Sequence, residues 1–311
     1  MTSSNRSAGT SYLRRVVTTL VVLAVLVALI LWAVSGLLGL GNPWASKREV
    51  TPPETSSDAE PFVPEPRTPD LSYEGFDPAF IISDEAFFDS QAYDQEQIES
   101  FIVKWNEGCR DGVDGTPCIT EFREDSPSFE PDQYCSLGFS GQEADTAASI
   151  IWKASQSCGI NPQVLLTLIQ KEQGLFTASG LRLDESRYNI ATGFACPDAS
   201  VCDPAYFGFA TQVYYAARQM RKYEANPYSY MVQPGVPVSI PYAPGEDCEG
   251  PVVTVANLAT SNLYNYTPYQ PNAAALSGSR DACTTWGNQN FYAFFNAWFG
   301  TPEKALESAG S

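Results

Sequence analysis

The pattern of apolar and polar residues is clearest in residues 161–174, which read NPQVLLTLIQKEQG. Asn161 is a preferred N-cap residue, and Pro162 stands at the first helical position, where its missing N–H costs nothing. The apolar residues that follow cover most of the helix circumference, and Gly174 supplies a left-handed stop. The pattern therefore predicts a helix that is buried on nearly all sides.

Several other segments carry apolar residues at helical spacing. They predict a mainly α protein with helices at residues 94–105, 144–157, 209–225 and 288–299. Residues 252–262 fit either a helix or a strand, and we expect a helix there. The proline-rich residues 234–248 predict a loop or a short hairpin, and residues 80–82 predict a buried segment followed by a turn.

Residues 16–40 contain no charge, and a bilayer crossing needs about 20 such residues. This pattern predicts a transmembrane anchor after a cytoplasmic tail at residues 1–15. A cleaved signal peptide is the alternative, because Ala33-Val34-Ser35 resembles a cleavage site, although the apolar run exceeds the usual length of about 7–15 residues. Residues 41–71 follow as a proline-rich, acidic linker, which we expect to be extended.

The globular part after the linker is expected to lie outside the cell membrane. We divide it into an N-terminal lobe at residues 72–143 and a helical domain at residues 144–301, with a flexible tail at residues 302–311. All cysteines of the chain fall in this part, and their even number without a C-x-x-C pair favours four disulfides over a zinc site. They are Cys109, Cys118, Cys135, Cys158, Cys196, Cys202, Cys248 and Cys283. Their proximity in the chain suggests 109–118 and 196–202 as pairs and leaves the others open.

The charge balance and the residue types present limit the classes of function that the chain can have. The chain has 36 acidic and 18 basic residues, so nucleic acid is not an expected partner. It has no histidine, which excludes Ser-His-Asp and Cys-His nucleophiles and every histidine-ligated metal site. No metal or organic cofactor is implied. The chemistry that remains is that of carboxylates.

Glu172 is the carboxylate that the pattern singles out. It falls in the last turn of the helix predicted at 161–174, beside the negative end of the helix dipole, where a second negative charge is disfavoured. Such a position suits a general acid, and a solvated glutamate at a helix tip is the plainer alternative. Residues 262–272, NLYNYTPYQPN, add tyrosines and amides that suit sugar binding, although tyrosines also fill disulfide-rich cores.

Residues 144–300 resemble the lysozyme-like superfamily, particularly lytic transglycosylases and bacterial glucosaminidases. The segment from Ile160 to Gly174 resembles the helix that ends in the family's catalytic Glu. The segment FGFATQ, residues 207–212, resembles a Gly-Leu-Met-Gln element with one residue too many, and LYNYTP, residues 263–268, is similar to a Tyr-Asn-Ala-Gly-Pro motif. The wider pattern also resembles secreted actinobacterial proteins often labelled haemagglutinin-like.

The resemblance implies a lysozyme-like helical fold in which Glu172 is the catalytic acid. Side chains that position the sugar are expected at Gln212, Tyr264, Asn265, Tyr266 and Tyr269. Gln173 stands where the family usually has Ser, and Thr267 stands where the motif has Gly. A second carboxylate, needed for hydrolysis, could come from Asp184 or Glu185; Asp198 and Asp203 are equally open, and pairing with a nearby arginine is the alternative for this acidic cluster.

The sequence therefore predicts a membrane-anchored, extracytoplasmic enzyme that cleaves peptidoglycan or another cell-wall glycan. A glycan-binding or adhesion module without turnover, on the same fold, is the alternative.

Overall fold

The computed structural model describes residues 25–27, 66–198, 200–245 and 247–300. The chain divides into two units, Met1–Pro61 and Phe62–Ser311. In the first, residues 25–27 are helical. The rest of the predicted anchor, the cytoplasmic tail, the linker up to residue 65 and the C-terminal tail lie outside the described residues. Within the described ranges, no helix is both long and apolar enough to cross a membrane.

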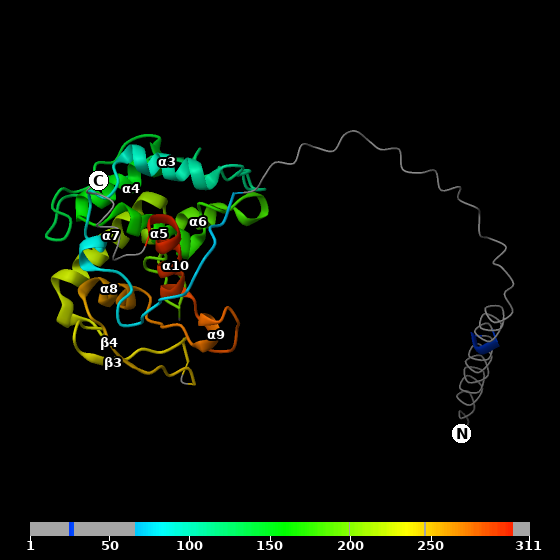
Figure 1. Cartoon of the computed structure of the whole chain (residues 1–311). Coiled ribbons are helices and arrows are strands. Elements are labelled where there is room, and N and C mark those ends of the chain that lie inside the picture. The colour runs from blue at the N-terminus through cyan, green and yellow to red at the C-terminus, as the bar shows by residue number, and fades with distance from the viewer. Residues whose placement is uncertain (1–24, 28–65, 199, 246, 301–311) are drawn as a thin grey trace, which may run out of the picture. The chain divides into compact units, whose positions relative to one another are not determined.

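The second unit is built mainly of helices, as predicted (Figure 1). The α-helices are α2 (Asp84–Phe87), α3 (Gln95–Asn106), α4 (Ala147–Cys158), α5 (Pro162–Gln173), α6 (Glu185–Asn189), α7 (Phe209–Ala225), α8 (Leu258–Tyr266), α9 (Ala273–Leu276) and α10 (Gly287–Phe299). The described residues of this unit also form three short 3₁₀ helices, η1 (Gly180–Arg182), η2 (Pro204–Tyr206) and η3 (Pro227–Ser229). The strands form two antiparallel pairs, β1 (Arg123–Glu124) with β2 (Asp145–Thr146) and β3 (Pro237–Ser239) with β4 (Val252–Thr254).

Local sequence signals set the ends of the long helices. The Asn161 side chain accepts a hydrogen bond from the Gln163 N–H at the start of α5, and Gly174 ends the helix with a φ of 64°. Helix α3 begins with a capping box at Asp94. Helices α3, α4, α7 and α10 all fall within three residues of their predicted bounds.

The prediction of a helix at residues 252–262 is wrong for the first residues of this range. Val252–Thr254 is the strand β4, paired in register with Pro237–Ser239, so the hairpin alternative for the preceding segment is confirmed. Helix α8 begins only after Asn257, whose side chain accepts a hydrogen bond from the Thr260 N–H. The N-cap asparagine fixes the start of the helix, and the residues before it gain a strand partner instead.

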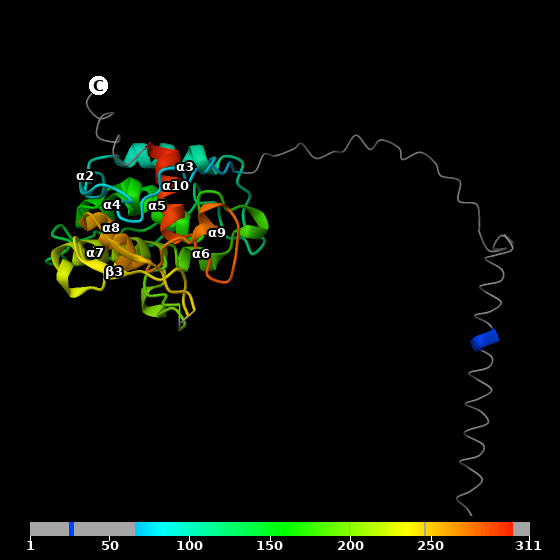
Figure 2. The same cartoon turned by 60° about the horizontal axis from the view of Figure 1, so that its bottom comes forward.

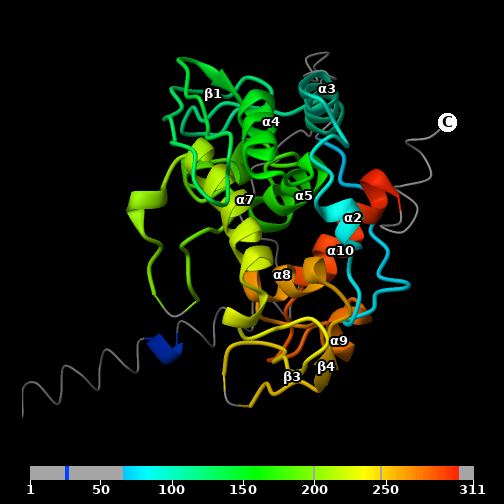
Figure 3. The same cartoon turned by 90° about the vertical axis from the view of Figure 1, so that its left-hand side faces the viewer.

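The helices enclose one hydrophobic core. Helix α5 packs between α4 and α10, and α4 packs along α7 (Figure 3). Residues of the predicted N-terminal lobe join the same core. Figure 2 shows α3 beside the end of α10. Phe101 of α3 stacks on Phe299 and meets Trp298 edge-on at this end. The predicted lobe and the helical domain thus share one core.

All eight cysteines pair, as predicted. The bridges are Cys109–Cys118, Cys135–Cys158, Cys196–Cys202 and Cys248–Cys283. The two pairs suggested by proximity are confirmed.

Candidate functional site

The C-terminal end of α5 is held rigidly in place. Leu165, Leu166 and Ile169 are fully buried on this helix. The Gln170 side chain donates to the Thr177 hydroxyl at 2.8 Å and accepts from the Phe176 N–H at 3.1 Å, which fixes the turn that follows the helix. A residue at this tip therefore has a defined position.

Glu172 lies at this tip and is paired with a cation. Its Oε1 is 2.5 Å from the ammonium of Lys171, whose side chain is only 3% exposed. The same ammonium donates to the hydroxyl of Thr267 at 2.6 Å and lies 6.0 Å from the ring centre of Tyr266. The Lys171 cation thus offsets the unfavourable dipole that the sequence predicts for Glu172.

Glu172 opens onto a cavity of about 540 Å³. One wall comes from residues 190–198, which include Gly193 and the disulfide-bonded Cys196. The other comes from residues 265–269, at the C-terminal end of α8 and just beyond it. Gly193 has a φ of 69°, and a Cβ at this position would lie 3.2 Å from Oε2 of Glu172. The backbone therefore approaches the carboxylate closely on this side.

Three predicted sugar-binding residues, Asn265, Tyr266 and Tyr269, line this cavity together with Glu172. The Tyr266 hydroxyl donates to the Thr192 carbonyl at 2.9 Å, and burial, followed by the charge of Glu172, raises the pKa of Tyr266 well above its ordinary value. Burial and the neighbouring Asp198 raise the pKa of Tyr269 to about 12. Both phenols therefore stay neutral at physiological pH.

Gln212 and Tyr264 lie elsewhere, because both are fully buried and neither lines the cavity. The Gln212 amide donates to the carbonyls of Phe194 and Tyr206, at 3.0 and 2.8 Å, so it fastens the wall of the cavity. Tyr264 and Tyr266 are two positions apart, about 200° around a helix. Because of this rotation, Tyr264 faces the core and Tyr266 faces the cavity.

The four acidic residues that could supply a second carboxylate also lie in different places. Asp184 caps α6, accepting from the Ser186 N–H at 3.0 Å, and Asp203 caps η2. Glu185 lines a different cavity. Asp198 is the one that shares the cavity with Glu172, and it accepts a hydrogen bond from the Tyr269 hydroxyl at 2.5 Å. The sequence could not distinguish these four acids, because no local pattern indicates which of them reaches the cavity at Glu172.

The cavity lined by Glu185, of about 490 Å³, also contains Glu124, a carboxylate that no sequence pattern indicated. Glu124 accepts a hydrogen bond at 2.9 Å from the N–H of Ala210, at the start of α7. Gly208, with a φ of 103°, gives it room, since a Cβ there would lie 2.8 Å from Oε1 of Glu124. The two partners are 86 positions apart in the chain, so no local signal could reveal the contact.

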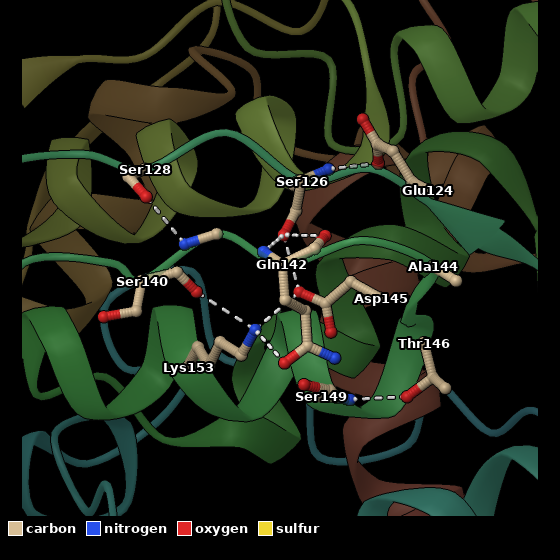
Figure 4. Close-up of polar contacts among 12 residues, drawn as sticks. Glu124, Ser126, Ser128, Ser140, Gln142, Ala144, Asp145, Thr146, Ser149 and Lys153 are labelled. Carbon is tan, nitrogen blue, oxygen red and sulfur yellow. Dashed lines mark hydrogen bonds and ion pairs between the residues drawn. The ribbon is translucent and has the colours of Figure 1, made fainter.

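Glu124 also faces a second acid across the β1–β2 pair. Asp145 is the register partner of Glu124. The Asp145 side chain is fully buried; it accepts a hydrogen bond from the Ser126 hydroxyl at 2.7 Å and pairs with the Lys153 ammonium at 2.6 Å (Figure 4). Burial, together with the charge of Asp145, raises the pKa of Glu124. Lys153 thus neutralises one acid of the pair and leaves the other in a partly desolvated site.

The described residues contain no group of three or more Cys, Asp or Glu side chains that could hold a metal ion. Comparison with protein-family models, with curated proteins and with solved structures found no match for this chain.

Proposed function

We propose that this protein is a membrane-anchored, extracytoplasmic enzyme that cleaves cell-wall glycan on a lysozyme-like helical fold, with Glu172 as its acid and base. The observation that carries the proposal is the placement of Glu172. Its carboxylate, at a rigid helix end, opens onto a cavity that is also lined by Asp198, Asn265, Tyr266 and Tyr269. The resemblance of residues 160–174 and 263–268 to lytic transglycosylase motifs supports the same choice.

The chemistry needs one proton transfer in each direction. Glu172 in its acid form gives its proton to the glycosidic oxygen, the bond to the anomeric carbon breaks, and an oxocarbenium-like centre forms. The carboxylate that remains then takes a proton from the attacking hydroxyl. If that hydroxyl belongs to the substrate sugar, the product is a 1,6-anhydro sugar and one carboxylate is enough. If it is water, Asp198 is the second carboxylate that shares the cavity.

The contact with Lys171 favours a second candidate, a glycan-binding module without turnover. An ammonium at 2.5 Å pairs with a carboxylate rather than with a neutral acid. In this alternative, the residues that line the cavity hold a sugar, and Glu172 completes the binding surface.

Mass spectrometry of the soluble products released from purified cell wall tests both candidates. Wild-type protein should release glycan fragments, and their masses separate anhydro from reducing ends. Glu172→Gln keeps the shape of the side chain, and it should release none above background while still sedimenting with cell wall. If neither protein releases fragments and both sediment equally, the binding module is correct and the enzyme proposal is not.

A further inference from the structure

Lys171 occupies an unusual position for a lysine. Its ammonium is buried, with two partners, the Glu172 carboxylate at 2.5 Å and the Thr267 hydroxyl at 2.6 Å. Burying a charge costs free energy unless the charge is paired and hydrogen-bonded, and these two partners meet that requirement for Lys171. Adjacent residues on a helix do not ordinarily face each other. Lys171 meets Glu172 because its side chain turns toward the segment after α8.

The segment that receives Lys171 is fixed by α8 and α10. The Thr267 N–H donates to the Leu263 carbonyl at 2.8 Å, and the Asn288 amide donates to the Thr267 carbonyl at 2.9 Å. Gly287 begins α10 beside them. A Cβ there would lie 2.5 Å from Cγ2 of Thr267 and 3.7 Å from Cε of Lys171. The start of α10 therefore leaves room for the contact between Lys171 and Thr267.

We infer that Lys171 is a positioning residue that holds Oε1 of Glu172 and leaves Oε2 for the substrate. This role deepens the proposed function and rests on it. Oε2 is the oxygen beside Gly193, on the wall of the cavity. The Lys171 ammonium stabilises the carboxylate form of Glu172, which the reaction reaches once the proton has passed to the glycosidic oxygen, and it keeps that carboxylate oriented to take a proton back. Thr267 in turn fixes the ammonium.

The contact itself can be tested without any activity. Ammonium protons that are buried and hydrogen-bonded exchange slowly with water, so Lys171 should give a lysine Nζ–H signal in ¹H–¹⁵N NMR that disappears in Lys171→Met. The signal should shift or broaden in both Glu172→Gln and Thr267→Val, because each variant removes one partner. A signal that neither variant moves, or its absence from wild type, would overturn the inference.

Kinetics of glycan release test the positioning role. Lys171→Met should lower kcat at least about tenfold, since a misplaced catalytic group costs on the order of a hundredfold, with KM changed less than about threefold. Lys171→Arg should restore part of kcat.

Lys104→Met is the matched control, because Lys104 is exposed on α3. Equal kcat values for the Lys171→Met and Lys104→Met proteins would refute the role. Absence of release by wild type would instead refute the proposed function, and the NMR signal would still decide whether Lys171 holds Glu172.

Discussion

Two glutamates of this protein lie at opposite kinds of helix end. Glu172 is at the C-terminal end of α5, where the helix dipole opposes its charge, and Lys171 supplies the compensating cation. Glu124 is in β1, and its side chain contacts the N-terminal end of α7, where the dipole favours its charge, yet burial and Asp145 raise its pKa. The helix end alone therefore does not decide how a carboxylate behaves.

The two sites also differ in what surrounds them. Both cavities are lined by aromatic residues and amides. The cavity at Glu172 contains one further acid, Asp198, whereas the cavity at Glu124 contains two, Asp114 and Glu185. The two segments that resemble lytic transglycosylase motifs, residues 160–174 and 263–268, meet at the first cavity. We therefore propose catalysis at Glu172 and a structural role for Glu124, and each prediction below can break that assignment.

The largest difference is expected in turnover. Glu172→Gln removes the transferable proton and should lower glycan release by at least about a hundredfold, because general acid–base catalysis contributes roughly 10²–10⁴-fold. Glu124→Gln, the matched variant in the other cavity, should stay within about threefold of wild type. Both rates are measured from reducing or anhydro ends released from cell wall. A loss in Glu124→Gln alone would move the active site to the second cavity.

The glycines beside the two carboxylates give a smaller contrast. Gly193→Ala and Gly208→Ala each force a side chain into a left-handed backbone, and each should lower the free energy of unfolding by about 1–3 kcal/mol. Denaturant unfolding measures this loss. Gly193→Ala also presses on Oε2 of Glu172 and should lower glycan release about tenfold. Gly208→Ala should spare release under conditions where it remains folded. Equal effects on release would contradict the assignment.

The smallest effect concerns pH. Because the pKa of Glu124 is raised in the folded protein, the folded state keeps the Glu124 carboxyl protonated at pH values where the unfolded chain has lost that proton. The stabilising contribution is complete below the unfolded pKa, near 4.3, and is lost as the pH rises through the folded pKa. The stability of wild type relative to Glu124→Gln should therefore fall as the pH is raised from about 4 toward neutral. Urea unfolding of both proteins across this range checks it, and parallel curves would refute it.

The amino-acid sequence determined the features that depend on neighbouring residues. The N-cap Asn161, the stop at Gly174 and the apolar residues between them predicted α5 to its observed ends. The same signals placed Glu172 at the tip, and proximity in the chain predicted two disulfides. These features follow from backbone hydrogen bonding and helix periodicity, which act over a few residues.

Tertiary structure alone decided which side chains meet. Tyr264 and Gln212 matched motifs in the sequence, yet both are buried, whereas Asp198 reaches the cavity from a loop. The contacts of Lys171 with Thr267 and of Glu124 with Ala210 join positions 96 and 86 residues apart. Such contacts depend on how whole helices pack, and packing is set by the shape of the complete core rather than by any local pattern.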